Sequence, residues 1–146
     1  MNRLMLTAVL IATVSWGLGA VFDKTSLNSM PDLPIVSAVV VRQAIALAAL
    51  CILGAFNGSL REVRKVPTSA WVLLCISGAF GVGIAGVAYY YAVQHGEISR
   101  ISVFCSGYPI ITLLLAVPIL REALTVPKVV GTVLVVSGLV VLSGGG

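Results

Sequence analysis

A single arginine interrupts a long apolar stretch of the sequence and is the first candidate for a functional residue. Arg42 is the only charged residue in LPIVSAVVVRQAIALAALCILGAF, which runs from Leu33 to Phe56. Its guanidinium could bind an anionic or polar group of a substrate, or an acidic side chain on a neighbouring helix. It could equally be a structural arginine that binds free carbonyls or extends to lipid headgroups. The sequence leaves these alternatives open.

The segment SWGLGAVFDK supplies a second set of polar side chains. Trp16 has an indole N–H that needs a partner, so it could line a substrate pathway, or it could anchor a helix at the membrane interface. Asp23 and Lys24 follow the apolar run. We expect them to form a solvated pair in a loop, with a place beside the pathway as the alternative.

Three consecutive tyrosines, Tyr89 to Tyr91, end another apolar stretch. They fit an aromatic belt at the membrane interface. Because three consecutive helical positions span about 200° of the helix surface, at least one ring should point inward. We name Tyr90 as the candidate substrate-binding residue. The polar link that follows holds His95, which could relay protons but is more typical of a solvated loop.

Pro109 lies in the middle of the apolar run SVFCSGYPIITLLLAVPIL. Proline removes a backbone hydrogen bond and frees the carbonyl four residues earlier, at Cys105. Broken helices at membrane depth are where transporters bind substrate, so Ser106, Tyr108 and Pro109 are candidate binding residues. The alternative is a simple kink whose free carbonyl is satisfied by a neighbouring serine or threonine.

Arg121 and Glu122, in REALT, close the same run. Glu122 could pair with Lys128 or with Arg61 and its neighbours. Such a pair would act either as a gate between helices or, in the interpretation we favour, as an ordinary salt bridge at a helix end.

The sequence contains no set of residues typical of catalysis. There is one histidine, no nucleophile elbow, no pair of carboxylates within an apolar stretch and no phosphate-binding loop. We therefore predict that the protein is not an enzyme and expect neither a cofactor nor a metal site.

The elements that must position these residues are membrane-spanning helices. Of the 146 residues, 59% are hydrophobic and only 10% are charged, which excludes a water-soluble domain. A bilayer core about 30 Å thick needs about 20 apolar residues in a helix. We predict an all-α integral membrane protein with a single domain, residues 1–146. Its five spanning helices are expected at about residues 4–22, 33–56, 69–93, 98–120 and 126–142.

The distribution of basic residues predicts the orientation, because cytoplasmic loops carry an excess of Lys and Arg. With the N-terminus in the cytoplasm, the inner segments hold six basic residues and the outer segments hold two. The inner ones are Arg3, Arg61, Arg64, Lys65, Arg121 and Lys128, and the outer ones are Lys24 and Arg100. We predict a multi-pass protein of the cell inner membrane with the C-terminus outside. Arg42 would then lie roughly 13 Å below the outer end of its helix, at about 1.5 Å per residue.

Taken together, these segments resemble the EamA-like repeat of the drug/metabolite transporter superfamily. The resemblance rests on SWGLGAVFDK, on RQAIALAAL beginning at Arg42, and most specifically on the block from YYYAVQHGEISR to the final VVGTVLVVSGLVVL. In that block the central proline, Glu122 followed by Leu124 and Thr125, and the glycines of the last stretch match the family pattern. The family often has Gly before this Glu, whereas this chain has Arg121.

The resemblance implies one five-helix half of a ten-helix transporter, whose two halves have inverted topology and move small metabolites by alternating access. A single half encloses little cavity, so a partner is expected. The partner would be a second copy forming a homodimer, or a different, oppositely oriented five-helix half. We predict a transporter subunit for a small polar or amphipathic metabolite; a non-transporting membrane scaffold is the alternative. The partners expected are this molecule and the lipid bilayer, with no nucleic acid.

Overall fold

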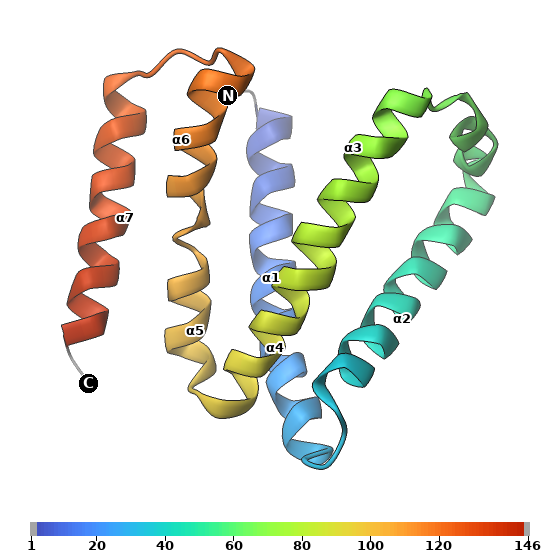
Figure 1. Cartoon of the computed structure of the whole chain (residues 1–146), viewed down its shortest axis with the longest axis horizontal. Helices are drawn as coiled ribbons and strands as arrows, with labels where there is room; N and C mark the ends of the chain where they lie inside the picture. The colour runs from blue at the N-terminus through green and yellow to red at the C-terminus, as the bar shows by residue number, and fades with distance from the viewer. Residues whose placement is uncertain (1–2, 145–146) are drawn as a thin grey trace. The chain divides into compact units, whose positions relative to one another are not determined.

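The computed structural model describes residues 3–144, and every regular element in that range is a helix (Figure 1). This confirms the all-α prediction. The predicted domain of residues 1–146 also includes residues 1–2 and 145–146, which lie outside the described range. The elements are α1 (Arg3–Ser29), α2 (Ile35–Phe56), the 3₁₀ helix η1 (Ser59–Lys65), α3 (Thr68–Gly78), the π-helix η2 (Ala79–Ile84), α4 (Ala85–His95), α5 (Ile98–Cys105), α6 (Tyr108–Leu120) and α7 (Val126–Gly144).

Five helical stretches are long and apolar enough to cross a membrane, in agreement with the predicted number. They are Arg3–Ser29, Ile35–Phe56, Thr68–His95, Ile98–Leu120 and Val126–Gly144. Two of the five contain an irregularity, because η2 lies between α3 and α4, and a short break separates α5 from α6. The chain is therefore a multi-pass membrane protein.

Helix α1 continues seven residues beyond its predicted end at Phe22 and ends at Ser29. The prediction that Asp23 and Lys24 form a solvated loop pair is therefore wrong, because both residues lie inside the helix. Two serine hydroxyls bind carbonyls of this last part of α1, with Ser26 Oγ 2.9 Å from Asp23 O and Ser29 Oγ 3.0 Å from Thr25 O. Pro31 then follows, and the residue before a proline disfavours helical geometry. The helix ends where proline stops it and not where the first charge appears.

The third span is a continuous rod in which the π-helix η2 separates α3 from α4 (Figure 1). The sequence pattern gave no expectation of this π-helix, which contains Gly81 and Gly83. A π-turn widens the helix and loosens its regular hydrogen bonding, and such turns are frequent at functional sites.

The fourth span is broken at Ser106 and Gly107, as Pro109 predicted. The backbone N–H of Ser106 donates to Ser102 O at 3.0 Å, and that of Gly107 donates to Phe104 O at 3.0 Å, so α5 closes with a tightened turn. Pro109 then lies in the first turn of α6, where its missing N–H costs nothing. A Cβ on Gly107 would lie only 2.8 Å from Leu139 Cδ1, so α7 approaches closely at the break.

The chain divides into two compact units. Residues 22–95 form one unit, which we call the α2–α4 unit, and residues 3–21 with 96–144 form the other, which we call the α5–α7 unit. In the α2–α4 unit, α2 packs on α4. The buried residues of this unit cluster near the start of α2 and the end of α4; they are Asp23, Leu27, Ala38, Val39, Tyr90 and Val93, with Gly54 further along α2.

The α5–α7 unit contains the N-terminal part of α1, the broken span α5 and α6, and α7, which packs against α5. A hydrogen bond between residues far apart in the sequence also joins α5 to α7: Arg100 Nη2 donates to Leu142 O at 3.1 Å. In both units most large apolar side chains are exposed; Leu10, Leu47 and Leu134 are examples, each more than half exposed. Such surfaces suit contact with lipid or with another membrane protein.

The connection after α6 contains the only non-glycine residue in the described range with a positive φ. Arg121 has φ 54° and ψ 35°, the left-handed conformation that ends many helices and favours glycine. A left-handed turn thus forms here although the position holds an arginine and not a glycine. The left-handed region costs a residue with a Cβ roughly 1–2 kcal/mol.

We expect Arg121→Gly to stabilise the protein by about 0.5–1 kcal/mol, because glycine removes this strain but makes the unfolded chain more flexible. The measurement is the thermal unfolding midpoint of the purified protein in detergent. Arg121→Ala is the matched control, because it removes the charge and keeps the strain, and it should not raise the midpoint. An equal rise in both variants would show that the charge, and not the backbone, is responsible.

Candidate functional site

Three side chains from three helices meet inside the α2–α4 unit. Oδ1 of Asp23, on α1, accepts a hydrogen bond of 2.7 Å from the hydroxyl of Tyr90, on α4. The same oxygen lies 3.2 Å from Nε of Arg42, on α2. The Arg42 guanidinium carbon is 6.0 Å from the centre of the Tyr90 ring, at the edge of the range for a cation–π contact. We call this set the Asp23 cluster.

The helix lengths bring the three residues to one level. Asp23 lies six residues before the end of α1, Arg42 lies seven after the start of α2, and Tyr90 lies five before the end of α4. At about 1.5 Å per residue, all three are about 8–10 Å from the helix ends. Arg42 is therefore slightly shallower than the depth of roughly 13 Å expected from a helix beginning at Leu33.

Small and apolar residues let the helices approach closely enough for the cluster to form. A Cβ on Gly86 of α4 would be 3.4 Å from Val39 Cγ1 of α2, so glycine keeps these two helices close. Val93, one turn beyond Tyr90, is fully buried. Its carbonyl accepts a hydrogen bond of 2.7 Å from Lys24 Nζ, which adds a second link between α1 and α4.

The burial of Asp23 explains why the cluster is necessary. This residue is only 8% exposed. A carboxylate buried in an apolar helix is costly unless an opposite charge and hydrogen-bond donors compensate it. Arg42 supplies the charge and Tyr90 supplies a donor. Arg42 itself keeps 45% of its side chain exposed, so it compensates Asp23 without being enclosed.

The structure therefore joins two of the predicted site residues, Arg42 and Tyr90, and adds Asp23, which the sequence analysis placed in a loop. Tyr90 is 3% exposed, whereas Tyr91 is 59% exposed, so the inward-pointing tyrosine is the predicted one. The position of Asp23 inside a helix could have been predicted from Pro31, because this is the first residue able to stop α1. The structure thus places an acidic side chain inside a helix that is long and apolar enough to span a membrane.

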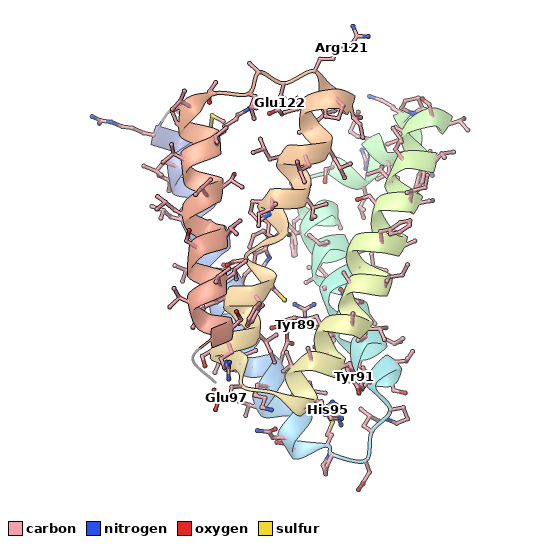
Figure 2. All side chains as sticks on the ribbon, turned by 60° about the vertical axis from the view of Figure 1, so that its left-hand side comes forward. Tyr89, Tyr91, His95, Glu97, Arg121 and Glu122 are labelled. Atoms are coloured by element: carbon pink, nitrogen blue, oxygen red, sulfur yellow. The ribbon has the colours of Figure 1, made fainter. Side chains whose placement is uncertain are left out.

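Tyr91 packs against His95 at the end of α4, with ring centres 4.4 Å apart (Figure 2). Nδ1 of His95 is 2.8 Å from the carbonyl oxygen of Tyr91, and the imidazole is exposed. This pair is a local feature of the end of α4. It gives no support for a proton relay through His95.

The predicted residues at the helix break lie in the α5–α7 unit. Tyr108 and Pro109 line one end of a groove of about 540 Å³ between α6 and α7, whose walls are mainly apolar. Ser106 does not line this groove; its hydroxyl donates to Val103 O at 2.6 Å, within its own helix turn. Trp16 belongs to the same unit, where its side chain is 68% exposed.

The other end of the groove holds Glu122 and Lys128. Lys128 Nζ donates to Glu122 Oε2 at 2.8 Å and to Ala123 O at 3.1 Å. Of the partners considered for Glu122, Lys128 is thus the one it contacts. Both side chains are about 40–50% exposed, and exposed pairs contribute about 0–1 kcal/mol. Arg121 points away from α6 and α7 (Figure 2), which leaves the pair as a link between the ends of those two helices.

Comparison with known proteins identifies a family over the same residues that the structure describes. The model of the EamA-like transporter family matches residues 3–144. The chain belongs to the EamA-like transporter family. It is also 30% identical, over 134 residues, to an uncharacterised protein of the archaeon Methanocaldococcus jannaschii, and the match covers 92% of each chain. No solved structure matches the chain.

We expect Asp23 and Arg42 to be energetically coupled, because removing either one leaves the other charge uncompensated in an apolar site. Asp23→Ala and Arg42→Ala should each destabilise the protein, and the double variant should be more stable than the sum of the two effects by about 1–3 kcal/mol. Unfolding in detergent of the four proteins provides the measurement. Additive effects would mean that the two side chains do not interact.

Tyr90→Phe offers a smaller test of the same cluster. It keeps the buried ring and removes only the hydroxyl that donates to Asp23, so a loss of about 1.5–3 kcal/mol is expected, as for hydrogen bonds to charged groups. Tyr91→Phe, in the exposed neighbouring tyrosine, is the matched control and should change stability by less than about 0.5 kcal/mol.

Proposed function

We propose that this protein is a subunit of a secondary transporter that moves a small polar or amphipathic metabolite by alternating access. The observation that carries this proposal is the Asp23 cluster, in which a charge pair and a tyrosine hydroxyl join three membrane-spanning helices. Ionisable residues inside such helices are costly and generally mark substrate or ion pathways. Membership of a transporter family supports the same function.

In this proposal Arg42 orients the substrate, and Tyr90 and Asp23 hold the Arg42 side chain in place. The break between α5 and α6, with Ser106, Tyr108 and Pro109, contributes a second part of the pathway. Trp16 contributes an aromatic surface to it, and Glu122 with Lys128 limits access at the predicted cytoplasmic end. The irregular backbone of η2 and of the break is where the helices can bend during the transport cycle.

The working unit is proposed to be a dimer, with the N-terminus of the chain in the cytoplasm and the C-terminus outside. An odd number of spans places the two ends on opposite faces. The match to the Methanocaldococcus jannaschii protein covers 92% of each chain, which supports a unit of this length. The exposed apolar surfaces on both units support burial against a partner as well as against lipid. An antiparallel partner would rebuild the inverted repeat that secondary transporters use.

The transport activity can be tested on the whole pool of small metabolites in a cell. Metabolites inside and outside cells that express the wild-type chain should be compared by mass spectrometry with those of cells expressing Arg42→Gln. At least one metabolite should redistribute several-fold with the wild type. It should return to the background level with Arg42→Gln, because the neutral amide cannot orient a charged group.

The control for that experiment is Arg61→Gln, which removes an exposed arginine of η1 outside the cluster. It should leave the redistribution unchanged, and the amounts of all three proteins in the membrane should be equal. Unchanged redistribution with stably inserted Arg42→Gln would remove Arg42 from the mechanism. No redistribution with the wild type would instead favour the scaffold, in which the cluster only holds helices together.

The dimer makes a separate prediction about orientation. In a background without Cys51, Cys75 and Cys105, single cysteines at Ser59 (Ser59→Cys) and at Ser143 (Ser143→Cys) are labelled from outside intact cells by an impermeant reagent. An inverted homodimer requires each site to be labelled in about half of the molecules, because every transporter then contains one copy of each orientation. Labelling of Ser143→Cys alone would show one orientation and would require an oppositely oriented partner chain.

A further inference from the structure

The Arg42 guanidinium uses only one of its edges within the chain. Its Nε faces Asp23 Oδ1 at 3.2 Å. In the part of the chain that the structure describes, the terminal nitrogens Nη1 and Nη2 donate no hydrogen bond, and Nε is the nitrogen paired with Asp23. These two nitrogens carry four of the five N–H donors of an arginine. With 45% of the side chain exposed, the unused edge is open to a ligand.

The contacts that Arg42 does make restrict the direction of that open edge. Asp23 binds the inner edge, and the Asp23 carboxylate is itself held by the Tyr90 hydroxyl at 2.7 Å. The guanidinium carbon of Arg42 lies over the Tyr90 ring, 6.0 Å from its centre. Because Asp23 and Tyr90 are buried, they form a fixed support beneath a side chain that is otherwise long and flexible.

We propose that the Nη1 and Nη2 edge of Arg42 binds a carboxylate group of the transported molecule, and that this molecule is a monoanion. This rests on the proposed transport function and names the class of its substrate. A guanidinium presents parallel N–H donors whose spacing matches the two oxygens of a carboxylate. Asp23 and Tyr90 act as positioning residues, since they contact Arg42 and not the ligand.

The charges around the cluster favour a single negative charge on the ligand. Asp23, Lys24 and Arg42 together have a net charge of +1, and Lys24 is anchored to Val93 O at 2.7 Å. A monocarboxylate brings this set to zero, whereas a dianionic phosphate would bring it to −1. In an apolar environment the neutral combination is the less costly one.

The test uses the purified full-length chain in a non-ionic detergent. The probes are short fatty acids, aromatic acids and N-acetylated amino acids, each measured beside its own primary amide, together with alkyl monophosphates. Thermal unfolding identifies the compounds that stabilise the protein, and calorimetry gives their Kd. One or more carboxylates should bind, and the matching amide should bind at least about tenfold more weakly, because it lacks the charge that the guanidinium pairs with.

Four variants separate a binding role from a structural one. Arg42→Gln should abolish carboxylate binding, and Arg42→Lys should weaken it by about tenfold, because lysine keeps the charge but lacks the planar pair of donors. Asp23→Asn raises the net charge of the set to +2, so it should shift the preference toward alkyl monophosphates, a change that a purely structural role would not cause. Arg100→Gln removes an arginine that binds Leu142 O on α7 and should leave binding unchanged.

Several results would overturn the proposal. Equal binding of acids and amides, carboxylate binding that survives Arg42→Gln, or a wild-type preference for phosphates, including those of lipid headgroups, would each exclude a carboxylate at Arg42. Binding by no carboxylate of the panel would also overturn it. If cells still redistribute a neutral or cationic metabolite in an Arg42-dependent manner, the transport function stands and only the substrate class is wrong.

Discussion

The cost of burying one carboxylate is the constraint on which the α2–α4 unit depends. Asp23 is almost fully enclosed, and an isolated charge in that position would destabilise the helices around it. Its compensation comes from two other helices, with Arg42 providing the charge and Tyr90 the hydrogen bond. The pairing therefore fixes how α1, α2 and α4 meet. The small residues near this point, such as Gly86 and Ala38, permit the close approach that the pairing requires.

Signals that are local in the sequence predicted most of the fold. Hydropathy alone identifies five spans, and Pro109 alone places the break in the fourth, because each depends on the chemistry of one short segment. The end of α1 also has a local signal in Pro31, but the charged residues in its last part depend on distant residues. The charges of Asp23 and Lys24 predict a loop. Their positions inside α1 become favourable through partners on other helices, which are Arg42, Tyr90 and the Val93 carbonyl. The π-helix η2 also had no local signal beyond its glycines.

The two charge pairs of the candidate site show the same distinction. Glu122 and Lys128 lie close together in the sequence, and their pairing was among the expected alternatives. Both side chains are substantially exposed, so their bond links the ends of α6 and α7 but contributes little to the free energy of unfolding. Asp23 and Arg42 lie on separate helices, and only Asp23 is enclosed, so their pairing cannot be predicted from sequence spacing alone. The residue that matters most to the cluster is thus the one that sequence reasoning placed outside the membrane.

The geometry of the Asp23 cluster also distinguishes how ligands of opposite charge would act on it. An anion can bind the open edge of Arg42 while Nε remains on Asp23, so the ligand adds to the existing pair. A cation, by contrast, has to compete with Arg42 for Asp23. A ligand shifts a conformational equilibrium only by its differential affinity for the two states. An anionic substrate would therefore strengthen the contact between α1, α2 and α4, whereas a cationic one would weaken it. The charge of the bound ligand thus decides in which direction the cluster changes access to the pathway.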